Sequence, residues 1–173
     1  MALREIARSE RASESSEALA EDRARWIAAC EAACDKVYRA VVAMGATPQD
    51  AADAVQDAVE HALRLKVPGD RPEGWLFVVA LRSWKRQRWR QRLFYPLDVL
   101  RGATYSAPRD EQIALLVELA KLTDRQRTVL IALYALGLSQ KEIGRILGVA
   151  PGTVGSIATQ ASKKLREQLG EEP

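Results

Sequence analysis

A helix predicted to begin at Pro151 carries uncharged side chains that could hydrogen-bond to DNA base edges. Val154 and Ile157 of this helix are expected to face the protein core. Its remaining polar positions then face outward, and a glutamine among them is suited to pair with adenine. We take them as candidate contacts to the base edges of DNA, with nearby cations to hold phosphate. The set is Thr153, Ser156, Thr159, Gln160, Lys141, Arg145 and Lys163.

The segment Leu138–Ser156 supplies the elements that must position these side chains. Ser139 followed by Glu142 forms a capping box that opens a first helix. Gly148 is placed to end that helix in a left-handed conformation, and Pro151 suits the first turn of the next. This pattern predicts a helix-turn-helix, which places its second helix in the DNA major groove. A plain helical hairpin is the alternative interpretation.

Two upstream segments of opposite charge indicate two different partners. Six basic and no acidic residues lie between Trp75 and Arg92, and four acidic and no basic residues lie between Asp50 and Glu60. Aromatic residues among cations suit melted DNA, which needs stacking surfaces and phosphate contacts. For Trp75 and Phe77, core packing is the favoured alternative. For Trp84 and Trp89, packing and base contact remain open, and the acidic face could be solvated surface.

Helical periodicity predicts an all-α protein of two helical domains joined by a flexible linker. We place a frayed or loosely helical tail at 1–15, a first domain at 16–94, the linker at 95–109 and the helix-turn-helix domain at 110–173. The expected helices run from Ser16 to Met44, from a Thr47 cap to about Leu63, from Trp75 to Leu93, from Glu111 to Lys121, and from a Thr123 cap to Leu136 with Gly137 as its stop. Residues Lys66–Gly74 form a loop.

Composition narrows the class of protein further. The 173 residues are 47% apolar with net charge +3, and they include no apolar run long enough for a membrane span or signal peptide. We therefore expect a cytoplasmic protein. Cys30 and Cys34 are expected in the core, and His61 has no metal-ligand spacing relative to them. We expect no metal, no cofactor and no catalytic residues, because no nucleophile with a paired base, phosphate-binding glycine loop or metal cluster is recognisable.

Three stretches together resemble the extracytoplasmic-function group of bacterial RNA polymerase sigma factors, with regions 2 and 4 only. Residues Leu122–Leu130, Gly137–Ile143 and Leu147–Val154 resemble region 4, Asp50–Asp57 resembles region 2.2, and Gly74–Ala80 with the basic run resembles regions 2.3 and 2.4. The resemblance implies a transcription initiation factor that binds core RNA polymerase, at the β′ coiled coil and the β flap, and promoter DNA. An anti-sigma protein is a further partner common in this group.

The resemblance also assigns candidate residues in the first domain. Polymerase docking falls to Asp53, Gln56, Asp57 and Glu60, and minus-10 contact to Arg82, Trp84, Lys85, Arg86, Arg88 and Trp89. The sequence departs from the family pattern at Leu81, Arg82 and Arg86 and in the uncharged run Gly155–Ser162. Two alternatives therefore stay open. One is a helix-turn-helix regulator acting without polymerase, and the other is a sigma-like adaptor with weakened promoter reading.

Overall fold

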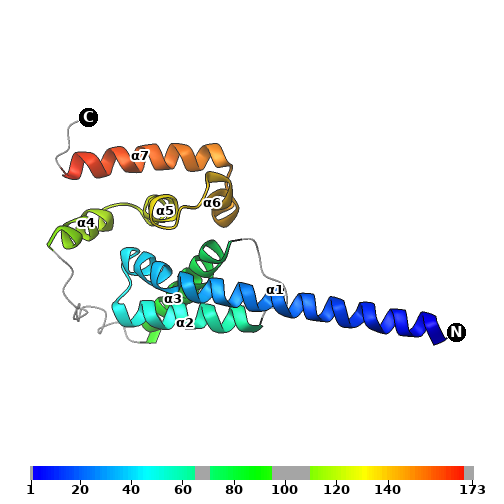
Figure 1. Cartoon of the computed structure of the whole chain (residues 1–173). Coiled ribbons are helices and arrows are strands. Elements are labelled where there is room, and N and C mark those ends of the chain that lie inside the picture. The colour runs from blue at the N-terminus through cyan, green and yellow to red at the C-terminus, as the bar shows by residue number, and fades with distance from the viewer. Residues whose placement is uncertain (1, 65–70, 95–109, 170–173) are drawn as a thin grey trace.

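The computed structural model describes residues 2–64, 71–94 and 110–169, and these ranges are mainly helical and contain no strand (Figure 1). The predicted all-α class is confirmed. No helix in the described part of the chain is long and apolar enough to cross a membrane. The segment 95–109, predicted as a linker, lies outside the described residues.

The first helix is much longer than the sequence indicates. α1 spans Ala2–Ala43, so the tail expected before Ser16 is a continuous part of this helix. The physical reason is composition, because residues 2–43 contain no glycine or proline and are rich in alanine, glutamate and arginine, which are strong helix formers. Figure 1 shows this N-terminal part projecting beyond the other helices. Gly45, with φ of 97°, terminates the helix as expected.

Two further helices pack against the C-terminal half of α1. α2 spans Pro48–Arg64 and is capped by Thr47, whose hydroxyl accepts a hydrogen bond from the Asp50 amide at 3.0 Å. α3 spans Pro72–Phe94 and starts before the expected Trp75, because Pro72 suits a first helical position and needs no N–H partner there. The predicted loop Lys66–Gly74 therefore ends earlier, and its residues 66–70 lie outside the described part. Alanines of α2 allow close packing against α3, whose Leu76 and Phe77 are fully buried.

The helices α1, α2 and α3 form a first group. The second group contains α4 (Asp110–Ala120), α5 (Asp124–Leu130), η2 (Ile131–Ala135), α6 (Gln140–Leu147) and α7 (Pro151–Leu169). The Thr123 capping box is present as predicted. The expected α-helix through Leu136 instead widens into a π-helical turn at Ile131, where the Leu136 amide donates to the Ile131 carbonyl at 3.1 Å. Gly137 then adopts a φ of 66°.

The two groups share buried apolar side chains. A continuous cluster runs from Trp26 and Phe77 in the first group to Ile131, Leu136 and Leu138 in the second. Direct packing of η2 on α1 accompanies this cluster. The DNA-binding candidates of both groups are therefore held in one compact arrangement.

Candidate nucleic-acid interface

The helix-turn-helix forms with every predicted cap in place. The Ser139 amide donates to the Glu142 carboxylate at 2.7 Å, and the Glu142 amide donates to the Ser139 hydroxyl at 3.3 Å. Gly148 has a φ of 67°, and α7 begins at Pro151. The hydrogen bonds from the Ser139 side chain and amide, with burial opposing them, lower the pKa of the Glu142 carboxyl. The box is therefore strongest with Glu142 ionised.

Gly144 is a residue that sequence reasoning missed, although it sets the geometry of the turn. A Cβ atom built at this position would lie 2.7 Å from the Val149 carbonyl oxygen. Real Cβ atoms do not approach backbone so closely, so only glycine at position 144 allows the chain after α6 to fold back so near to the helix. The Val149 amide then donates to the Gly144 carbonyl at 2.9 Å. A glycine inside an amphipathic helix was the available signal.

α7 presents its predicted polar positions to the outside. Val154, Ala158 and Ala161 are buried against the rest of the domain. The exposed positions are Thr153, Ser156, Thr159 and Gln160. The Ser156 hydroxyl donates to the Gly152 carbonyl at 3.1 Å and the Thr159 hydroxyl to the Gly155 carbonyl at 3.0 Å. Both hydroxyl protons are therefore engaged within the helix, which leaves these groups chiefly as acceptors, while Gln160 keeps donor and acceptor groups.

The cations around this helix are placed to flank it. Lys141 and Arg145 are exposed on α6, and Lys163 is exposed on α7, 3.9 Å from Glu167. Lys164, beyond them, donates to the Lys121 carbonyl at 3.1 Å and so ties α7 to the end of α4. The geometry allows phosphate contact by the first three, and these assignments stay predictions.

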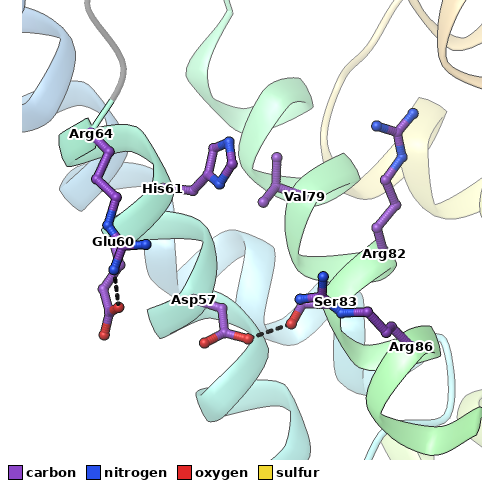
Figure 2. Close-up of a pocket in the computed structure, with 8 residues that line it drawn as sticks. All are labelled: Asp57, Glu60, His61, Arg64, Val79, Arg82, Ser83 and Arg86. Atoms are coloured by element: carbon purple, nitrogen blue, oxygen red, sulfur yellow. Dashed lines mark hydrogen bonds and ion pairs between the residues drawn. The ribbon is translucent and has the colours of Figure 1, made fainter. Parts of the chain in front are cut away.

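The acidic residues of α2 are less free than the sequence indicates. Asp57 accepts a hydrogen bond from the hydroxyl of Ser83 on α3 (Figure 2). Gln49 donates to Asp53 at 3.0 Å, and Gln56 donates to Glu60 at 3.3 Å. Asp57 therefore links α2 to α3, and the Glu60 carboxylate also pairs with Arg64 at 3.3 Å. Gln56, Asp57 and Glu60 are exposed and Asp53 is half-buried, so all four stay candidates for contact with a partner.

Acidic and basic surfaces meet in a shallow cleft between α2 and α3. Figure 2 shows the side chains that line it, which are Asp57, Glu60, His61, Arg64, Val79, Arg82, Ser83 and Arg86. The adjoining hollow adds Asp53, Gln56 and Gln87. The two oppositely charged faces predicted for separate partners are thus neighbours, and a partner at one of them lies close to the other.

The basic strip on α3 is exposed, but its two tryptophans differ. Arg82, Lys85, Arg86 and Arg88 are all exposed. Trp84 is only 4% exposed and lies in the core, with the Arg88 guanidinium 5.5 Å from its ring centre. Its assignment as a DNA contact is therefore corrected, because a buried indole cannot stack on a base. Trp89 is 64% exposed and stays a candidate.

Trp75 and Phe77 follow the alternative of core packing. Phe77 is fully buried, and Trp75 packs edge-on against Trp26 with ring centres 5.9 Å apart. His61 lies 5.8 Å from the same Trp75 ring. Within the described ranges, no three histidine, cysteine or carboxylate side chains are arranged to hold a metal ion.

Both cysteines lie on the inner side of α1, as predicted. Burial and the neighbouring Cys34 raise the pKa of the Cys30 thiol to about 11, and burial also raises the pKa of Cys34. The Cys34 thiol donates to the Cys30 carbonyl at 3.2 Å. They pack as small apolar groups.

Arg127 is the second residue that sequence reasoning missed. Its guanidinium is buried and donates to the carbonyls of Leu119 at 2.8 Å, Ala120 at 2.8 Å and Leu122 at 3.1 Å. Its remaining nitrogen donates to the Met44 carbonyl at 2.9 Å, at the end of α1. The only sequence signal was an arginine on the apolar side of a short helix.

Two helical groups and a capped helix-turn-helix define a class of DNA-binding helical protein, and comparisons with known proteins identify the family. The sigma-70 region 4 model matches residues 112–165. The extracytoplasmic-function sigma factor SigM of Mycobacterium tuberculosis is 31% identical over 136 residues, which cover 72% of this chain and 66% of that protein. FliA of Pseudomonas aeruginosa is 40% identical over 60 residues, and sigma-B of Bacillus subtilis is 39% identical over 64 residues.

The chain belongs to the RNA polymerase sigma factor family. It spans less than two thirds of the length of the curated relatives it matches, and the matched part covers 24% of FliA and of sigma-B. A solved structure, the sigma factor RpoE in complex with the anti-sigma factor NepR from Bartonella quintana, has the same fold. It superposes with a TM-score of 0.65 at 22% identity, over 82% of this chain and 94% of that one.

Proposed function

We propose that this chain is a transcription initiation factor that binds core RNA polymerase and directs promoter recognition and melting. The observation that supports it best is the capped helix-turn-helix at α6 and α7, inside a chain related to SigM over 136 residues. The factor carries no catalytic role and works in the cytoplasm with polymerase. An anti-sigma protein is included among its partners, by analogy with the RpoE complex.

The proposal divides the chain into two working parts. Residues 16–94 dock on polymerase and contact the minus-10 element, and residues 110–173 contact the minus-35 element. Residues 2–15 of the N-terminal stretch form the first part of α1. Docking falls to Asp53, Gln56, Asp57 and Glu60, of which the last three are exposed on α2, and Asp57 also accepts a hydrogen bond from Ser83 of α3.

Minus-10 contact falls to the exposed strip on α3, and minus-35 contact to the exposed face of α7. The strip comprises Arg82, Lys85, Arg86, Arg88 and Trp89. Its cations hold backbone phosphate, and the Trp89 indole supplies a stacking surface for an unpaired base. Gln160 reads base edges, and Lys141, Arg145 and Lys163 hold phosphate.

The test of docking is charge reversal on α2. Asp53→Lys with Glu60→Lys should weaken binding to core polymerase, because exposed charges steer association and fix its register. The matched control is Asp35→Lys, an exposed acid on α1 that pairs with Arg39. Equal binding by parent, double variant and control would contradict the assignment of α2 as the docking surface.

A second candidate is an adaptor that binds polymerase with weakened promoter reading. The observation that favours it is the uncharged outer face of α7, where two of the four polar side chains are engaged with their own helix. Under this alternative, Gln160→Ala would leave promoter choice unchanged. Under the leading proposal, the same change relaxes preference at one or two base pairs of the upstream element.

A further inference from the structure

The first two turns of α7, residues 151–157, carry little polar chemistry of their own. Helix-turn-helix geometry directs the N-terminal residues of the second helix at base edges. Here these residues include two glycines, Gly152 and Gly155, and their only polar side chains are the hydroxyls of Thr153 and Ser156. The Ser156 hydroxyl already donates to the Gly152 carbonyl. This part of α7 therefore offers few donors for the recognition of a base.

A side chain of α6 occupies the space beside Gly155. A Cβ atom built at Gly155 would lie 3.3 Å from Oε1, 3.4 Å from Nε2 and 3.6 Å from Cδ of Gln140. Its three nearest neighbours thus all belong to one side-chain amide. Gly155 is half-buried, whereas Gln140 is exposed. A polar group from α6 therefore lies against the flank of α7 and still reaches solvent.

The contact with this amide is the feature of position 155 that calls for glycine. The residue lies inside a helix of 19 residues, where glycine is a poor helix former. Among the described residues, positive φ values occur at glycines 45, 137 and 148, so the backbone at 155 does not require glycine. The nearest atoms are side-chain atoms, in contrast to the backbone oxygen at Gly144. A larger residue at 155 would displace the Gln140 amide.

The Gln140 amide and the amide of Gln160 lie at different heights along α7. Residues 155 and 160 are separated by about 7.5 Å along a helix axis. Base pairs follow one another at about 3.4 Å, so the two amides face different base pairs. The Gln140 amide is the one beside the N-terminal turns, which enter the major groove most closely in this class of motif.

We propose that Gln140 is a specificity-determining residue for the upstream promoter element, and that Gly155 seats its amide beside α7. The inference rests on the proposed function. A side-chain amide carries a donor and an acceptor side by side, which match N7 and the N6 amino group of adenine in the major groove. The two helices then read the element together, because α6 supplies the amide that the first turns of α7 lack.

The test is transcription in vitro with core polymerase and the full chain, over promoters randomised in the upstream element. Four variants are compared with the parent, which are Gln140→Ala, Gln140→Glu, Gly155→Ala and the double variant Gln140→Ala with Gly155→Ala. Ser139→Ala is the matched control, because it weakens the cap of α6 and leaves the neighbouring amide in the protein. Circular dichroism verifies that each variant keeps its helix content.

The two changes at Gln140 should act on one base pair. Gln140→Ala should reduce the preference for adenine there by about fivefold or more and leave the other positions unchanged. Gln140→Glu places a negative charge in the first turn of α6, where it favours the helix. A carboxylate cannot donate to adenine and accepts from cytosine, so the preference should move toward cytosine. Loss of stability cannot produce that shift.

Gly155→Ala separates the seating of the amide from its presence. The new methyl favours the helical state of α7, and it displaces the flexible end of the Gln140 side chain. The variant should therefore be at least as stable as the parent and still lose preference at the same base pair. In the Gln140→Ala background it should have no further effect on preference, since the two residues act through one contact.

The outcomes distinguish this inference from the proposed function. A parent that fails to initiate with core polymerase would refute both. A parent that selects an upstream element, with unchanged preferences in both Gln140 variants, would overturn the inference alone. Uniform weakening at all sequences by Gln140→Ala would overturn it too, because that result marks a phosphate contact. Equal loss of preference in Ser139→Ala would show that only the stability of α6 matters, and an unchanged preference in Gly155→Ala would overturn the seating role.

Discussion

The turn between α6 and α7 offers a sharp perturbation, because two glycines there should respond oppositely to the same change. At Gly144, a new methyl would lie 2.7 Å from the Val149 carbonyl oxygen, which is backbone and cannot rotate away. At Gly152, at the start of α7, a new methyl would meet nothing within 4 Å. Alanine favours the helix over glycine at both sites, by up to about 1 kcal/mol.

The magnitudes follow from these two surroundings. Overpacking costs about 1–3 kcal/mol, so Gly144→Ala should be destabilising by about 1 kcal/mol after the gain in helix propensity. Gly152→Ala should be neutral or stabilising by up to about 1 kcal/mol. For a chain of this size, a change of about 1 kcal/mol moves Tm by about 2–4 °C.

The assay is thermal unfolding followed by circular dichroism, with both variants and the parent at one protein concentration. Gly144→Ala should melt a few degrees below the parent and Gly152→Ala at or above it. Equal stabilisation by the two substitutions would show that the turn has room for a side chain and would refute the close-approach reasoning.

Three further predictions rest on other contacts. Ser139→Ala should be destabilising by about 1 kcal/mol at neutral pH. The pKa of Glu142 in the folded protein is lowered from its ordinary value of 4.5. The capping box therefore stabilises the fold fully above pH 4.5, and this stabilisation is lost as the pH falls through the folded pKa. The urea midpoints of Glu142→Gln and the parent should accordingly converge in acid. Iodoacetamide should leave Cys30 unmodified in the native protein at about pH 8 and label it after unfolding, since the pKa of that thiol is about 11, and native labelling would contradict its burial. Arg127→Met should lower the free energy of unfolding by about 2 kcal/mol or more, because buried carbonyls lose a charged donor, whereas an unchanged urea midpoint would show that water replaces it.

Local patterns in the sequence predicted the helix ends well. These ends depend on neighbours three or four residues away, so the local sequence predicts them. Examples are the caps at Thr123 and Ser139 and the left-handed turn at Gly148. The start of α3 was missed by three residues because Pro72 can belong to a loop or a first helical turn. The continuity of the N-terminal tail with α1 was missed because its apolar pattern is weak even though its residues favour helix.

Contacts between residues far apart in the chain could not be predicted from local sequence patterns. Arg127 contacts Met44, which is 83 residues away in the sequence, and Asp57 contacts Ser83, which is 26 residues away. No local spacing in the sequence therefore predicts either pair. Trp84 and Trp89 lie on different sides of the same basic helix, and only one of these sides faces α1 and α2. The sequence left them equivalent, and packing makes one buried and the other exposed.

The central claim is that this chain gives core RNA polymerase its promoter choice, and transcription in vitro over a random promoter library tests it most directly. Core polymerase with the full chain should initiate at a selected set of sequences that share an upstream and a downstream element. Gln160→Ala should relax one or two positions of the upstream element, while Arg145→Ala should weaken initiation at all selected sequences alike. Initiation no more selective than with core polymerase alone would contradict the account.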